Sequence, residues 1–253
     1  MKVYKSLFML LALAVVFSCS NAPSSGGSTS STSSTSSTSS TGSTSSTSST
    51  SSTSSTSSYN ETLVLFSEDA SLGTPMDIDF FNPNPSTTHE VRFDPWAGGD
   101  VSVAIIGGTP NVPASDEKAT YFEITVNSGA NWGGCGFQLT NNNRDTGGTN
   151  LTRFTNGYII FDLKMESSSP NFQITIENGT YPNVYTSKAV GIGSGSYGEA
   201  KDGQWHQIVI PISNFFNSSY DATKLEHVAS PFQIRATGGG GNKFYIDRIY
   251  WAR

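Results

Sequence analysis

Short stretches in which apolar and polar residues alternate recur along the chain after residue 60, separated by Gly, Asn, Pro, Ser and Asp. Alternation with a period of two gives each stretch an apolar and a polar face, as in a β-strand. It predicts eight strands, at Glu61–Phe66, Tyr121–Asn127, Gly136–Thr140, Gly157–Met165, Asn171–Glu177, His206–Ile212, Phe232–Thr237 and Phe244–Trp251. Only Asp221–Val228 has a helical pattern, with Asp221 as its cap. Many short strands without a long crossover helix favour an all-β fold, a single β-sandwich or jelly roll.

The start of the chain has the pattern of a secretory signal over residues 1–18. Lys2 and Lys5 precede an apolar run, Leu7–Phe17, and a small residue stands before Cys19. The run of about 11 apolar residues is too short to span a bilayer, which takes roughly 20. Its ending resembles the lipobox of bacterial lipoproteins, which implies that Cys19 is lipidated and is the first mature residue. The alternative is an ordinary signal peptide that is cleaved nearby.

Residues 21–58 consist almost wholly of Ser, Thr and Gly in a Ser-Ser-Thr repeat, without charge. Such a segment buries too little apolar surface to offset its ordering entropy, so a disordered linker is predicted for residues 19–58. A flexible coil of about 38 residues has an end-to-end distance of roughly 31–37 Å. Together with the lipid anchor, it predicts a domain tethered to the bacterial cell envelope, by analogy at the outer membrane and exposed at the surface.

The remaining residues, 59–253, are enough for one domain with a sizeable core. The net charge of −6 argues against a nucleic-acid partner, which calls for a basic face. Once Cys19 is lipidated, Cys135 is the one cysteine left, so no intrachain disulfide is expected. Cys135 is interpreted as a small buried apolar residue rather than as a nucleophile. We expect a monomer.

The polar faces of the predicted strands are rich in amide, carboxylate and guanidinium groups. If the strands are neighbours, these faces combine Gln138, Asp162, Lys164, Gln173, Glu177, Gln233 and Arg235. Planar groups with two donors or acceptors suit adjacent hydroxyls of a sugar ring. The pattern therefore predicts a carbohydrate-binding surface; the alternative is an ordinary solvated sheet face.

Aromatic side chains in loops are the second candidate feature, because a pyranose ring lays its C–H groups against an aromatic face. The candidates outside predicted strand interiors are Trp96, Trp132, Tyr181, Tyr185 and Tyr197. Trp132 is the strongest and Tyr185 is the preferred tyrosine, although core packing explains any of them as well. Trp205 and Trp251 are interpreted as packing residues.

Four motifs in order carry a family resemblance: Trp132–Phe137, Phe161–Lys164, Asp202–Pro211 and Phe244–Trp251. They resemble the galactose-binding-domain-like β-sandwiches that serve as carbohydrate-binding modules, in particular the non-catalytic C-terminal module of some marine exo-β-glucanases. The resemblance covers nearly all of residues 61–251. It implies a polysaccharide partner, such as a plant or algal β-glucan, and no chemistry on it.

The same resemblance implies a structural calcium ion. In such modules the ion lies where an acidic loop after the first strand meets an Asp on the last strand, and Glu68, Asp69 and Asp247 match those places. Calcium takes six to eight oxygen ligands, some of them backbone carbonyls. The alternative is that Asp69 caps a turn and Asp247 pairs with a basic side chain.

Catalytic patterns are scarce. The three histidines, His89, His206 and His227, have no zinc-ligand spacing, and Gly193–Gly198 spells a dinucleotide fingerprint without the helix that it requires. Asp162 and Glu177 are the one carboxylate pair considered for a glycosidase. A binding module is therefore the first hypothesis. A polysaccharide lyase or glycoside hydrolase and an envelope protein-protein interaction domain are the alternatives.

Overall fold

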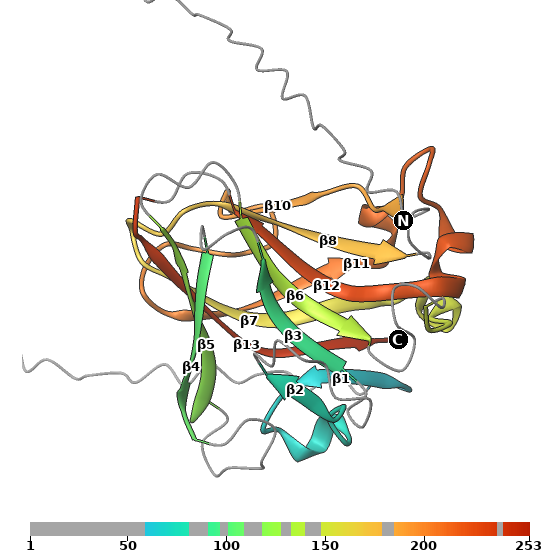
Figure 1. Ribbon diagram of the computed structural model, residues 1–253, viewed down its shortest axis with the longest axis horizontal. Coiled ribbons are helices and arrows are strands. Elements are labelled where there is room, and N and C mark those ends of the chain that lie inside the picture. Colours follow the sequence, from blue (N-terminus) through green and yellow to red (C-terminus); the bar gives the residue numbers. More distant parts are fainter. Residues whose placement is uncertain are drawn as a thin grey trace, which may run out of the picture. The chain divides into compact units, whose positions relative to one another are not determined.

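Two β-sheets lie face to face in the computed structural model, which describes residues 59–80, 91–96, 101–108, 118–127, 133–139, 148–178, 185–236 and 240–253. All of these residues belong to one unit, Ser55–Arg253. The predicted signal segment, Cys19 and the Ser/Thr repeat lie outside the described residues. Figure 1 shows β8, β12, β6 and β3 in one layer and β11, β7 and β13 in the other.

Sheet A has six strands among the described residues, in the order β11-β7-β13-β5-β4, with β1 also paired to β13. Every pair in it is antiparallel. Its strands are β1 (Thr62–Phe66), β4 (Val101–Gly107), β5 (Thr120–Val126), β7 (Tyr158–Met165), β11 (Trp205–Pro211) and β13 (Lys243–Ala252).

Sheet B has seven strands in the described part of the chain, in the order β10-β8-β12-β6-β3-β2, with β9 also paired to β8. The β2–β3 pair is parallel and the others are antiparallel. Its strands are β2 (Ile78–Phe80), β3 (Val91–Trp96), β6 (Gly133–Leu139), β8 (Phe172–Asn178), β9 (Tyr185–Thr186), β10 (Val190–Ile192) and β12 (Val228–Ala236).

Phenylalanines from the two inner faces form the core between the sheets. Phe172 of β8 stacks on Phe244 of β13 with ring centroids 4.3 Å apart and planes 7° apart. Phe161 of β7 meets Phe232 of β12 edge to face at 5.4 Å. All four rings are at most 2% exposed. Because both sheets hide one face in this way, their polar side chains gather on the two outer faces.

The β-sandwich expectation is confirmed, and each of the eight predicted strands overlaps an observed one. The predicted helical segment is η4, a 3-10 helix at Ala222–His227. The Asp221 carboxylate accepts a hydrogen bond from the Thr223 amide at 2.9 Å, as a cap does. Three shorter 3-10 helices lie at η1 (Ala70–Leu72), η2 (Thr152–Phe154) and η3 (Ile212–Phe215). No described helix is long and apolar enough to cross a membrane.

Cys135 is fully buried on β6, where burial raises the pKa of its thiol. It therefore packs in the core, as the sequence predicted. Trp251 is also fully buried, and its indole N–H donates to the Pro231 carbonyl at 3.2 Å. Trp205 differs, because it remains partly exposed on the outer face of sheet A.

The glycine-rich segment Gly193–Gly198 is a loop built around one carboxylate. Glu199 accepts from the backbone amides of Gly193, Gly195 and Tyr197, at 2.9, 2.9 and 2.8 Å. Burial opposes the charge of Glu199, but these backbone hydrogen bonds outweigh it and hold its pKa below the usual range. The amides that a dinucleotide phosphate would need are already occupied, so the fingerprint spelling has a structural role.

Replacing Glu199 by Gln will destabilise the domain. The amide NH2 then faces the Tyr197 N–H, and a charge-assisted hydrogen bond of this kind contributes about 1.5–3 kcal/mol. Because the folded pKa is depressed, the charged group stabilises the fold above its ordinary pKa, and this contribution fades as the pH falls through the folded pKa. Urea unfolding of both proteins at pH 7 and pH 3 measures this. An equal loss at the two pH values would contradict the role of the charge.

Candidate functional site

The outer face of sheet B brings together most of the polar residues that the sequence nominated. Backbone pairing aligns Gln173 of β8 with Arg235 of β12, and Arg235 with Gly134 of β6. The next row aligns Thr175, Gln233 and Gly136. We call the set Gln138, Gln173, Glu177 and Arg235 the sheet-B face.

Strand β6 contributes glycines to the middle of this face. Its Cys135, Phe137 and Leu139 are buried in the core, so the residues between them lie on the opposite side. Two of these are Gly134 and Gly136. A third glycine, Gly191 of β10, pairs with Gln173, and a side chain added there would meet nothing within 4 Å. Gly134 and Gly136 are themselves buried, so the uncovered backbone beside the polar side chains of β8 is at Gly191.

A hydrogen-bonded network fixes the polar groups along β8 and β12. The Thr175 hydroxyl donates to Gln233 Oε1 at 3.1 Å, and Gln233 Nε2 donates to Glu177 Oε2 at 2.9 Å. Gln233 is only 3% exposed and Thr175 only 1%. Gln233, which the sequence placed among the sugar-facing groups, is thus a positioning residue that orients Glu177.

Arg235 is the charged centre of the sheet-B face. Its nearest hydrogen-bond contact is Gln233 Oε1, 3.5 Å from one terminal nitrogen, and its Nε has no partner. Among the described residues no carboxylate forms an ion pair with it. Its cross-strand partner Gln173 is exposed. A guanidinium and an amide side by side, with donors to spare, are equipped to bind neighbouring hydroxyls or a carboxylate.

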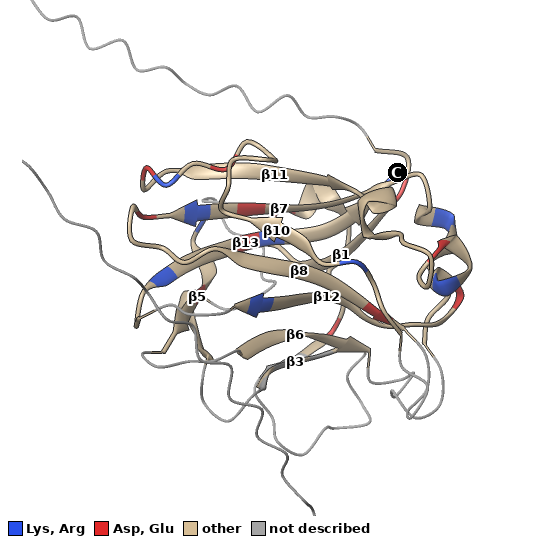
Figure 2. Ribbon diagram, turned by 90° about the horizontal axis from the view of Figure 1, so that it is seen from above, with Lys and Arg blue, Asp and Glu red and all other residues tan. Residues whose placement is uncertain are grey.

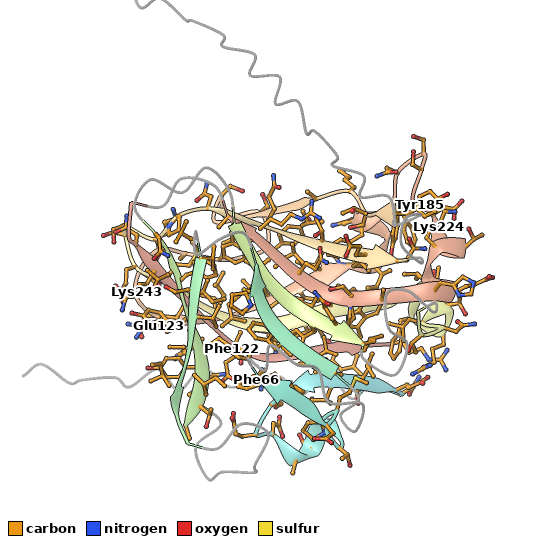
Figure 3. The ribbon with its side chains drawn as sticks, in the orientation of Figure 1. Phe66, Phe122, Glu123, Tyr185, Lys224 and Lys243 are labelled. Atoms are coloured by element: carbon orange, nitrogen blue, oxygen red, sulfur yellow. The ribbon has the colours of Figure 1, made fainter. Side chains whose placement is uncertain are left out.

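Tyr185 lies where β9 pairs with the end of β8, opposite Asn178, so the pairing places it on the other side of the strand from Glu177. It is 45% exposed, the largest exposure of any described aromatic side chain. The Lys224 ammonium lies 4.4 Å from the centre of its ring. Figure 3 shows the two side chains at one end of the sandwich, away from Glu123 and Lys243. An exposed ring held by a cation is a natural stacking surface.

Asp162 and Lys164 are not on this face, so the expectation that all the polar groups share one surface is wrong. Both belong to β7, which pairs with β11 and β13 in sheet A rather than with β8. Asp162 is buried in ion pairs, with Lys118 and with Arg248 Nε at 3.0 Å. Lys164 lies over the ring of Tyr245, 5.4 Å from its centre. Figure 2 shows the two charged positions of β7 side by side in its own layer, apart from that of β12.

Two of the aromatic candidates lie outside the described residues, namely Trp132 and Tyr181. Trp96 is described through its backbone, which pairs with Gly134 and so continues the row of Arg235 and Gln173. Tyr197 is partly buried, and its hydroxyl accepts a hydrogen bond from Asn214 at 3.0 Å. Of the tyrosines considered, Tyr185 is thus the one that the described structure leaves exposed, at the end of β8 rather than on the sheet-B face.

The three residues nominated for calcium have divided roles. Asp69 caps η1, accepting from the Ser71 amide at 2.9 Å, and Asp247 Oδ2 is 3.3 Å from the Lys118 ammonium, as in the alternative reading. Glu68 is buried, and neither of its carboxylate oxygens has a hydrogen bond of normal geometry. Burial and the nearby Asp247 raise the pKa of Glu68 to about 7, and burial raises that of Asp247 to about 6.

Two buried carboxyl groups therefore lie close together, and both oxygens of Glu68 lack a hydrogen bond, which is the arrangement that a cation relieves. No group of three or more His, Cys, Asp or Glu side chains suited to a metal occurs among the described residues. The fit to calcium is thus through Glu68 and Asp247, with further oxygens needed from elsewhere.

A family model described as "Carbohydrate binding domain 30" matches residues 90–253, more than half of the chain. The chain belongs to this family. The match confirms the resemblance to a carbohydrate-binding module, and it includes every member of the sheet-B face. A search of curated proteins found no match.

Several solved structures are similar to this carbohydrate-binding domain. A crystal structure of a family 30 carbohydrate-binding module has 13% identity and a TM-score of 0.49, covering 76% of this chain and 87% of the other. The family 30 module of a cellulosomal cellulase of Clostridium thermocellum has 14% identity and a TM-score of 0.46, covering 65% and 87%. The family 11 module of Clostridium thermocellum, solved with a β-1,3-1,4-mixed-linked tetrasaccharide, has 18% identity and a TM-score of 0.41, covering 70% and 94%.

Sequence reasoning missed the glycines of β6 and the buried network that orients Glu177. A signal for the first was present: Gly134, Gly136 and Gln138 alternate with Cys135, Phe137 and Leu139. The second had no such signal, because Thr175 and Gln233 are 58 residues apart and meet only through the pairing of β8 with β12.

Proposed function

We propose that the sheet-B face of this carbohydrate-binding domain binds a polysaccharide, such as a β-glucan, without cleaving it. The observation that carries the proposal is Arg235, a guanidinium without an ion-pair partner in the described structure, beside exposed Gln173. Glu177, oriented by Gln233, supplies an acceptor on the same face. Tyr185 supplies an exposed ring at the end of β8, beside this face.

The carboxylates support binding rather than hydrolysis. A glycosidase places two carboxyl groups on either side of one bond, about 5–9.5 Å apart. The pair considered from the sequence, Asp162 and Glu177, lies on different sheets, and Asp162 is committed to Lys118 and Arg248. Glu177 is partly exposed and hydrogen-bonded to an amide, which suits an acceptor for sugar hydroxyls.

Arg235→Ala will weaken binding of mixed-linkage β-1,3-1,4-glucan by about tenfold or more, since a central arginine typically contributes at least 1–2 kcal/mol to an interface. Affinity electrophoresis and titration calorimetry measure the change. Arg153→Ala is the matched control, because Arg153 is an exposed arginine paired with Glu61 and lies outside the sheet-B face. Equal affinities of the wild type and Arg235→Ala would remove Arg235 from the site.

A calcium ion held by Glu68 and Asp247 is the second part of the proposal, supported by the unsatisfied buried oxygens of Glu68 and by the raised pKa values of both groups. The ion would neutralise two carboxylates at the junction of the loop after β1 with β13. Asp69 would contribute through its cap of η1 rather than through a free carboxylate.

Removing calcium with a chelator will lower the melting temperature of the wild type and will leave that of Glu68→Gln nearly unchanged. The reason is that ligand bound to the native state alone stabilises it, and the variant lacks a ligand. Differential scanning calorimetry with and without chelator provides the measurement. Superimposed wild-type curves would reject the ion.

The third part of the proposal is that Cys19 carries a lipid and that residues 19–58 tether the domain to the bacterial cell envelope, with surface exposure at the outer membrane. The support is the sequence pattern at residues 1–19 and the Ser/Thr repeat after it. In this arrangement the domain holds a glycan close to the cell.

Cys19→Ala will move the protein from the membrane fraction to the soluble fraction of expressing cells, because the anchoring thiol is lost. Fractionation followed by immunoblotting measures the distribution. Cys135→Ala is the matched control, since that cysteine is buried in the core and is expected to leave the distribution unchanged. Membrane association of Cys19→Ala would refute the anchor.

A further inference from the structure

The outer face of sheet A carries an aromatic cluster that the sheet-B proposal does not use. Backbone pairing aligns Trp205 of β11 with Lys164 of β7, and Lys164 with Tyr245 of β13. Tyr121 of β5 meets both Trp205, with ring centroids 5.6 Å apart, and Tyr245, at 5.8 Å. All four side chains are partly exposed. We call these four residues the aromatic patch.

The polar atoms of the aromatic patch are not satisfied by the described part of the protein. The hydroxyls of Tyr121 and Tyr245 and the indole N–H of Trp205 have no hydrogen-bond partner among the described residues. Burial and then Glu123 raise the pKa of Tyr245, so its hydroxyl stays a hydrogen-bond donor. These groups are therefore directed at water or at a ligand.

Lys164 differs from the other lysines of this face because it lacks a carboxylate partner among the described residues. Lys243 pairs with Glu123 at 2.6 Å, and Lys118 pairs with Asp162 while lying 5.3 Å from the centre of the Trp205 ring. Lys164 has no carboxylate partner in the described structure and lies only over Tyr245. An ammonium group with unused hydrogen-bond donors thus lies over one ring of the aromatic patch.

Part of this outer face beside the aromatic patch is already covered. Further along β7, Ile160 is buried in a small apolar cluster with Val64 and Tyr250, against which Tyr59 and Leu72 pack. Asp162, between Ile160 and Lys164, is buried in its ion pairs. Cross-strand packing alone explains why the rings meet, but it does not explain three rings with free polar atoms beside an unpaired cation.

We propose that the aromatic patch is a second glycan-binding surface, on which a β-glucan chain lies against the rings and its hydroxyls bind Lys164 and the tyrosine hydroxyls. Rings offer apolar area to the C–H face of a pyranose, and the polar groups around them match its hydroxyls. The choice of ligand rests on the proposed function. Because the core separates the two outer faces, one domain would hold two chains at once.

A titration series and a precipitation assay test the second surface on the full-length chain. Mixed-linkage β-1,3-1,4-glucan tetrasaccharide is titrated into wild type, Trp205→Ala, Lys164→Met and Arg235→Ala, with thermal melts to show that each variant is folded. Wild type is expected to bind about two tetrasaccharides per chain, and each variant about one. Long β-glucan is expected to be cross-linked and precipitated by wild type and by none of the variants.

Tyr245→Phe keeps the ring and removes only the hydroxyl, so it guards against a variant that fails to fold. It is expected to weaken binding at the aromatic patch severalfold and to leave binding at the sheet-B face unchanged. One site in wild type, abolished by Arg235→Ala and unaffected by Trp205→Ala, would overturn the second surface while the sheet-B proposal stands. One site lost in Trp205→Ala and retained in Arg235→Ala would support the second surface and refute the sheet-B face. No binding by the wild type would refute both.

Discussion

Burial of one face of each sheet against the other is the constraint on which the rest of this domain depends. The stacked rings of Phe172 and Phe244 and the edge-to-face pair of Phe161 and Phe232 join the sheets. Once these side chains face inward, the alternation of each strand sends its remaining side chains outward. The polar network of β8 and β12 and the aromatic patch of sheet A are both consequences of this one requirement.

The sequence was sufficient for the fold class because long strands repeat the alternation several times. Strand β7, for example, alternates from Phe161 to Met165, and its prediction missed the start by one residue. The unpredicted strands β2, β9 and β10 span only two or three residues, so their alternation carries little information. β3 contains Pro95, and β4 is an edge strand whose Ile105 and Ile106 interrupt the pattern.

The candidate site was predictable only in part, because alternation determines the face of a residue and not the sheet to which its strand belongs. Gln173 and Arg235 were placed together correctly, since β8 and β12 are neighbours. Asp162 has the same local pattern, but β7 pairs within sheet A. The burial of Gln233 was not predictable either. Its position in the strand predicts an exposed glutamine, and only the fold brings Thr175 and Glu177 into hydrogen-bonding distance of it.

The cation over Tyr185 limits how a ligand can use that ring. An aromatic side chain that projects from a surface normally has two sides on which a flat molecule can rest. Here the Lys224 ammonium takes one of them, at 4.4 Å from the ring centre. A saccharide that stacks on Tyr185 must therefore use the opposite side of the ring, so only one side of this side chain is open to a glycan.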